Sequence, residues 1–172
     1  MTFEFRIVEA TTVEEFEQAA PLMREFVVWL RARYQETPKM IDTYYDAAAW
    51  ENELRSLQEQ YSAPNGALLL AVNADQQAGC VAMRKLDDGI CEMKRLYVRA
   101  PFHKFGIGRS LCEHLLGCAR DRGFHRMRLE TGDEQVEAQT LYRSMGFHDI
   151  GPYHAHPVEL LRRMVFMELV LQ

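Results

Sequence analysis

The spacing of apolar residues changes near residue 67, and this change constrains the fold more than any other feature of the chain. Before it, apolar side chains recur every three or four residues, which is typical of helices; they are Val13, Phe16, Ala20, Met23, Val27 and Leu30. Thr12 and Glu15 predict a capping box where the first helix begins, and Pro21 predicts that this helix bends or splits. A second helix is predicted from Tyr44 to Gln60.

Beyond residue 67 the pattern predicts mainly strands separated by turns. The predicted strands are Ala67–Asn73, Gly79–Leu86, Ile90–Val98, Arg126–Thr131, Phe147–Pro152 and Met164–Leu171, in addition to one that begins at Phe3. Helices are predicted from Gly106 to Arg122 and from Val136 to Met145, closed by Gly123 and Gly146. The single strand–helix–strand crossover, Ile90 to Thr131, predicts one parallel pair in a largely antiparallel sheet.

Composition excludes several classes of protein. The 172 residues contain no linker or repeat, so we expect one domain, residues 1–172. A net charge of −5 argues against a nucleic-acid partner. No apolar run is long enough to span a membrane, and Met1–Ala10 lacks the apolar stretch of a signal peptide. The cysteines show no metal-binding spacing, so we expect reduced thiols, no metal and a cytoplasmic protein; they are Cys80, Cys91, Cys112 and Cys118.

The most informative stretch for function is Tyr97–Ser110, where a strand leads through a short loop into a helix. The helix begins at Gly106 and Gly108, which let the backbone approach a ligand closely. Because the first N–H groups of a helix are unpaired and carry partial positive charge, this turn is suited to bind phosphate. The residue after Gly108 is Arg109, which excludes a Walker A loop, and Leu111 excludes the dinucleotide fingerprint.

Two motifs in the second half of the chain resemble the GCN5-related N-acetyltransferase (GNAT) family. His103–Gly108 is similar to the family signature Gln/Arg-x-x-Gly-x-Gly/Ala, with histidine at its first position. Ala138–Phe147 resembles the family's Ala-x-x-Leu-Tyr-x-x-x-Gly-Phe element. The resemblance implies a twisted, mostly antiparallel sheet of six to seven strands, flanked by about four helices and splayed open at the parallel pair.

The resemblance also implies where acetyl-coenzyme A binds. Backbone amides of the loop would hold the pyrophosphate, and the strand before it would pair with the pantetheine arm. An amide near Val98 would polarise the thioester carbonyl. Gln135 stands where many members have an asparagine that contacts coenzyme A. The expected cofactor-binding residues are Leu96, Tyr97, Val98, His103, Lys104, Phe105, Gly106, Ile107, Gly108, Arg109, Ser110 and Gln135.

The catalytic residues that the family likeness implies are Tyr142 as general acid and Glu92 as general base. Strand alternation puts Glu92 on one face with Lys94 and Leu96, where it acts directly or through water, or is simply paired with Lys94. A histidine or water alone could also take the proton. The acceptor site is expected to include Trp29, Tyr34 and His154.

The expected reaction is direct transfer of an acetyl group from acetyl-CoA to a small-molecule amine within a ternary complex. Two alternatives stay open: an acyl-CoA sensor without turnover, and an acetyltransferase for protein N-termini or lysines. A homodimer is possible, since exposed surfaces on such sheets often form dimers.

Overall fold

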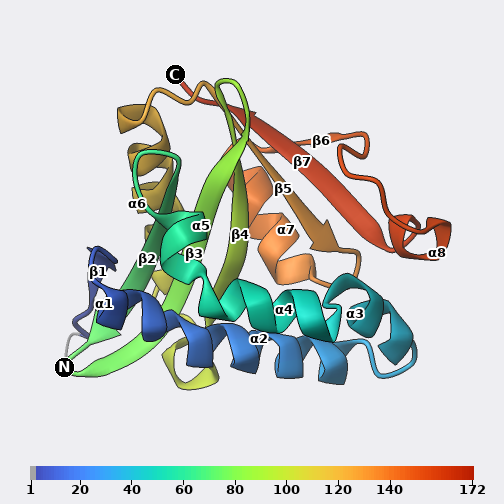
Figure 1. Ribbon diagram of the computed structural model, residues 1–172, viewed down its shortest axis with the longest axis horizontal. Coiled ribbons are helices and arrows are strands. Elements are labelled where there is room, and N and C mark those ends of the chain that lie inside the picture. The colour runs from blue at the N-terminus through green and yellow to red at the C-terminus, as the bar shows by residue number, and fades with distance from the viewer. Residues whose placement is uncertain (1–2) are drawn as a thin grey trace.

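The computed structural model describes residues 3–172. Met1 and Thr2, the first two residues of the Met1–Ala10 segment, lie outside the described residues. Seven strands form one sheet in the order β1-β2-β3-β4-β5-β7-β6 (Figure 1). They are β1 (Arg6–Glu9), β2 (Gly66–Asn73), β3 (Gln76–Asp87), β4 (Ile90–Val98), β5 (Arg126–Gly132), β6 (His148–Ile150) and β7 (Met164–Val170). Every neighbouring pair is antiparallel except β4 and β5, which confirms the predicted topology.

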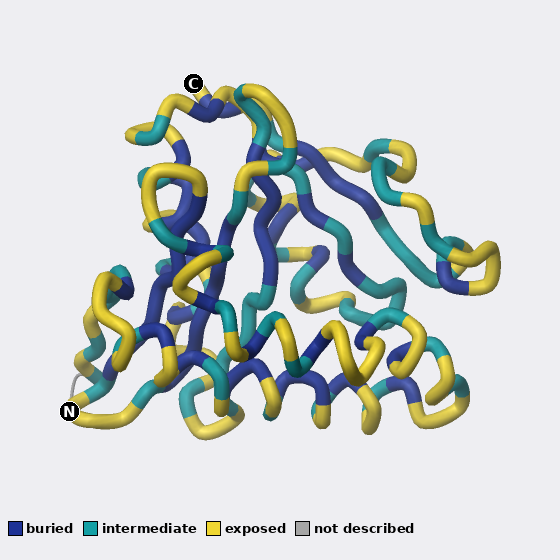
Figure 2. The backbone as a smooth tube through the Cα atoms, viewed as in Figure 1, coloured by how far each residue is buried: buried dark blue, intermediate teal, exposed yellow. Residues whose placement is uncertain are grey.

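Helices cover both faces of this sheet and create two hydrophobic cores (Figure 2). The first core lies under α6 (Ile107–Asp121) and α7 (Val136–Ser144). The second lies under the early helices, which are α1 (Val13–Glu17), α2 (Ala19–Arg33), α3 (Pro38–Tyr44), α4 (Ala47–Arg55) and α5 (Leu57–Tyr61). A short turn, η1 (Ala100–Phe102), follows β4, and α8 (Val158–Leu161) precedes β7. No helix among residues 3–172 combines the length and apolar character needed to cross a bilayer.

The early helices are shorter than the sequence predicts. The capping box of Thr12 and Glu15 is confirmed, and the predicted split falls at Gln18, between α1 and α2. Pro21 is accommodated in the first turn of α2, where its missing N–H leaves no bond unmade. The single helix predicted from Tyr44 to Gln60 is wrong, because the Asp46 carboxylate accepts the Ala49 N–H and starts a new helix there.

The parallel strands β4 and β5 diverge soon after they meet, as Figure 1 shows. They pair only from Ile90 to Glu92 on β4, against Arg126 to Arg128 on β5. Beyond these pairs, both strands continue with the edges that face each other unpaired. Because an unpaired strand edge can accept an extended ligand as an added strand, the divergence creates a binding cleft within the sheet.

A bulge in β4 changes which side chains face the cleft. Lys94 lies opposite Ala82 and Tyr97 opposite Cys80, so one residue too many stands between them. Arg95 takes up the excess with a φ of 62°, a left-handed conformation that is unusual for arginine. The prediction that Leu96 shares a face with Glu92 is therefore wrong: Leu96 packs against the first core.

Arg95 is held in this conformation by contacts with α4. Its guanidinium forms two hydrogen bonds with the Glu53 carboxylate, at 3.0 and 2.7 Å. The same group lies 5.1 Å from the ring centres of both Tyr45 and Trp50. These contacts offset the strain of the bulge, which costs on the order of 1–3 kcal/mol at such positions.

Candidate active site

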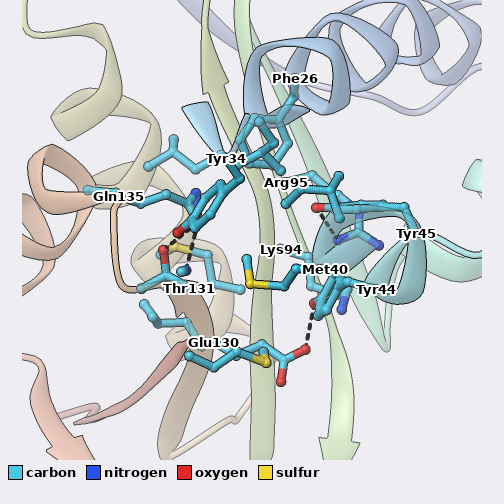
Figure 3. A pocket seen from close by; sticks show the side chains of 18 of the residues that line it. Phe26, Tyr34, Met40, Tyr44, Tyr45, Lys94, Arg95, Glu130, Thr131 and Gln135 are labelled. Atoms are coloured by element: carbon cyan, nitrogen blue, oxygen red, sulfur yellow. Dashed lines mark hydrogen bonds between the residues drawn. The ribbon is translucent and has the colours of Figure 1, made fainter. Parts of the chain in front are cut away.

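A small cavity passes through the sheet where β4 and β5 diverge (Figure 3). Its volume is about 80 Å³. The strands contribute Met93–Leu96 and Leu129–Gly132, and helices α2, α3, α7 and α8 close the remaining sides. Because its walls include residues of both hydrophobic cores, the cavity joins the two faces of the sheet. A donor bound on one face can therefore meet an acceptor that enters from the other.

The loop after β4 has the geometry of an anion site. Lys104 and Gly106 have φ angles of 68° and 77°, and α6 begins directly after Gly106. The first backbone hydrogen bond of the helix runs from the Ser110 N–H to the Gly106 carbonyl, at 3.0 Å. The amides of the three intervening residues have no partner within the helix. A Cβ atom built on Gly106 would meet no atom within 4 Å, so the turn is open to a ligand.

The side chains of this loop mainly stabilise its conformation. His103 Nε2 donates to the Val98 carbonyl at 2.8 Å and ties the loop back to the end of β4. Arg109 donates to Ser144 Oγ at 2.6 Å, which links α6 to α7. Phe105 is exposed and stacks on Phe3 with ring centres 4.2 Å apart, while Ile107 is buried in the first core. Lys104 is exposed beside the open turn.

Tyr142 projects from α7 into the cavity. Its side chain is buried against Phe147, with ring centres 5.8 Å apart. Burial raises the pKa of this phenol above its usual value, so the group is neutral at physiological pH. The hydroxyl donates no hydrogen bond to any group in residues 3–172, which leaves its proton free for a ligand.

Glu92 is fully buried and its carboxylate is surrounded by donors. Tyr153 and His154 donate to Oε2 at 2.9 and 2.7 Å, and Arg84 and Lys94 approach Oε1, each at 3.3 Å. Burial alone would raise the pKa of Glu92, but the charges of Lys94 and His154 and the Tyr153 hydrogen bond lower it to about 2. The pairing of Glu92 with Lys94 is thus confirmed as a contact. A carboxylate of such low basicity cannot readily remove a proton itself.

His154, which is hydrogen-bonded to Glu92, is a second group on the acceptor side that can accept a proton. Its Nε2 lies 2.7 Å from the carboxylate and donates to it, so Nδ1 is the ring nitrogen that can exchange a proton with a ligand. The imidazole side chain is 29% exposed, and it lies in the connection between β6 and β7. Glu92 therefore orients His154 as a proton acceptor.

Glu130 is a site residue that the sequence interpretation missed. It projects from β5 into the cavity, where Tyr44 donates to Oε1 at 2.5 Å (Figure 3). His156 donates to Oε2 at 3.1 Å. A signal was present, since alternation along Arg126–Thr131 turns Glu130 away from the face of Leu129. Arg126 and Arg128 share that face of β5, so alternation alone did not distinguish Glu130 from these charged neighbours.

Ligand atoms of Glu92, Glu130 and His154 all lie within 4.8 Å of one another, a spacing that a metal ion could use. Two of the four groups around Glu92 are cations, Arg84 and Lys94. Because these cations already offset the carboxylate charge, we interpret the cluster as a hydrogen-bonded network.

The remaining predicted residues differ in their relation to the cavity. Tyr34 lines it, with its hydroxyl accepting the Glu134 N–H at 2.9 Å. Gln135 also lines it, and its Oε1 accepts the Gly132 N–H at 2.7 Å, so the side chain stabilises its own loop. Trp29 does not line the cavity: it stacks on Phe26 and lies under the Arg33 guanidinium.

Comparison with known proteins agrees with this geometry. The sequence profile of the acetyltransferase (GNAT) family matches residues 23–147. An uncharacterised N-acetyltransferase of Schizosaccharomyces pombe is 34% identical over 121 residues, which span 69% of this chain and 72% of that protein. An IAA acetyltransferase of Azospirillum brasilense is 32% identical over 130 residues, spanning 73% and 83%.

Solved structures show the same fold over the full length. The crystal structure of PaiA N-acetyltransferase from Thermoplasma acidophilum, a complex with coenzyme A, has a TM-score of 0.71 and 18% identity, covering 97% of this chain and 99% of its own. A putative acyl-CoA N-acyltransferase from Klebsiella pneumoniae has a TM-score of 0.73 and 23% identity, with 99% of each chain covered.

The fold and the divided sheet define an acyltransferase that uses an acyl-coenzyme A donor. The chain belongs to the GNAT family of acetyltransferases.

Proposed function

We propose that this protein transfers an acetyl group from acetyl-CoA to the amine of a small molecule, by direct attack in a ternary complex. The observation that carries the proposal is the cavity between β4 and β5, which has Tyr142 on one face of the sheet and Glu130 on the other. A thioester and an amine that meet in this cavity would have a proton donor and a proton acceptor on opposite sides.

The donor half of the site would bind acetyl-CoA. The free amides at the start of α6 would hold the pyrophosphate, helped by Lys104 and Arg109. The pantetheine arm would run along Leu96–Val98, on the strand edge that β5 leaves unpaired. Fixed backbone donors there would stabilise the negative charge that develops on the thioester oxygen.

In the transfer, the neutral amine nitrogen attacks the carbonyl carbon of the thioester. The C–N bond forms, the C–S bond breaks, and the amine loses one proton while the thiolate gains one. Glu130, whose carboxylate lines the cavity, would accept the first proton, and His156 would relay it to the outer loop. Glu92 would act through His154 as a second route. Tyr142 would protonate the thiolate.

The shape of the acceptor half supports a small substrate. The cavity of about 80 Å³ is well below the roughly 300 Å³ at which typical ligand pockets begin. It adjoins a larger surface groove of about 600 Å³ between α3 and α8, and the two share Met40 and Leu160. We propose this groove as the route by which the amine substrate enters.

Residues 1–172 would act as one domain. The free thiols among the described residues are consistent with a cytoplasmic location.

A thiol-release assay with acetyl-CoA and a panel of small amines tests this function. We expect turnover by the native protein and a 10²-fold or larger loss of kcat in Tyr142→Phe, since general acids contribute about that much. The affinity for acetyl-CoA, measured by calorimetry, should stay within about threefold, because the phenol ring still packs on Phe147. Tight coenzyme A binding without turnover of any amine would instead identify an acyl-CoA sensor.

A further inference from the structure

Lys94 is a buried lysine, and its contacts within the described residues leave some of its hydrogen-bond donors without a partner. Its side chain is only 7% exposed, and it lines the cavity on the acceptor side (Figure 3). An ammonium group has three donors. The one ion pair of Lys94 within the described residues is to Glu92, at 3.3 Å. Because Lys94 lines the cavity, a ligand bound there can take up its remaining donors.

Lys94 is one of two cations that face the Glu92 carboxylate. Arg84 already supplies a positive charge at 3.3 Å, and Tyr153 and His154 donate hydrogen bonds to the other carboxylate oxygen. Placing a second cation beside the same carboxylate is costly, because a buried ammonium loses its hydration. A further anion in the cavity would compensate this cost.

Two groups of opposite charge lie close together on the acceptor side of the cavity. One part is the Lys94 ammonium, and the other is the Glu130 carboxylate, which has an oxygen within 4.8 Å of Glu92. Arg95 adds no free charge, since its guanidinium is fully engaged by Glu53. A purely cationic acceptor would be repelled by Lys94, whereas an acceptor with both signs of charge would complement both groups.

We propose that Lys94 binds a carboxylate of the acceptor, so that the substrate is a small amino acid or a similar amine with a carboxylate close to its nitrogen. The carboxylate would receive the unused donors of Lys94, and the amine would lie toward Glu130 and the thioester. This inference rests on the small-amine acetyltransferase function proposed above. It makes Lys94 a specificity-determining residue.

The test compares matched pairs of acceptors, each an α-amino acid and its amide, such as glycine with glycinamide and alanine with alaninamide. Thiol release from acetyl-CoA gives kcat/KM for both members, corrected for the fraction of neutral amine. We expect the native protein to favour the amino acid by tenfold or more. In Lys94→Met, which keeps the length and apolar stem, kcat/KM for the amino acid should fall to that of the amide, mainly through KM.

Lys85→Met is the matched control, because Lys85 lies on β3 in an exposed ion pair with Asp88 and does not line the cavity. It should keep the native preference. A native protein that accepts the amides as well as the amino acids would overturn the inference and leave the amine acetyltransferase function standing. So would a Lys94→Met variant that keeps the preference. If no member of any pair is acetylated, both the function and the inference are wrong.

Discussion

Glu92→Gln should lower stability by an amount that depends on pH. The pKa of Glu92 lies at about 2 in the folded protein and at 4.5 for an unperturbed group. This difference corresponds to about 3 kcal/mol of unfolding free energy at neutral pH. Because the folded pKa is the lower one, the contribution is complete well above pH 4.5 and is lost as pH falls toward 2. Linkage predicts that about 1.4 kcal/mol of it disappears between pH 7 and pH 3.5.

Urea unfolding of the native protein and of Glu92→Gln, each at pH 7 and pH 3.5, measures the contribution of Glu92 to the unfolding free energy. At pH 7 we expect the variant to be less stable by about 3 kcal/mol, or to melt roughly 6–12 °C lower for a chain of this size. The difference in unfolding free energy between the native protein and the variant should narrow by about 1.4 kcal/mol at pH 3.5. Glu51→Gln removes an exposed ion pair with Arg24 and should leave the unfolding free energy nearly unchanged at both pH values. An equal gap at both pH values for Glu92→Gln would refute the depressed pKa.

Two further variants test the two halves of the cleft. Gly106→Glu places a carboxylate in the open turn and should abolish measurable acetyl-CoA binding in calorimetry, whereas Gly117→Glu, on an open stretch of the same helix, should bind normally. Normal affinity in Gly106→Glu would exclude this turn as the phosphate site. Glu130→Gln keeps the hydrogen-bonding shape beside Tyr44 but removes the base, so kcat should fall about 100-fold with unchanged acetyl-CoA affinity. A near-normal kcat would assign the proton to His154 or to water.

The features that could be predicted from the sequence are local ones. Apolar spacing indicated the sheet and the crossover from Ile90 to Thr131, and the glycines at 106, 123 and 146 marked helix ends where φ is indeed positive. Each of these depends on a few consecutive residues. The open turn at the start of α6 was predictable for the same reason, since its glycines and its helix are adjacent in the chain.

The unpredicted features depend on residues far apart in the sequence. Glu92 meets Tyr153 and His154 across about sixty positions, and no local pattern encodes that contact. Tyr44 reaches Glu130 in the same way, from the last residue of α3, whereas the sequence interpretation made Tyr44 the first residue of a helix that runs to Gln60. The choice of base therefore needed the three-dimensional arrangement, while Tyr142 and the turn before α6 could be identified from neighbouring residues.

The bulge at Arg95 has a consequence for how this sheet could evolve or be engineered. It shifts the alternation of β4 by one residue at the point where that strand leaves its parallel neighbour. Deleting Arg95 would restore regular alternation with Leu96 still on the face of the first core, but it would remove the guanidinium that pairs with Glu53. Such a deletion would relieve backbone strain but leave the Glu53 carboxylate buried without its counter-ion, so we expect a net loss of stability, and the strained bulge is the more stable solution for this sheet.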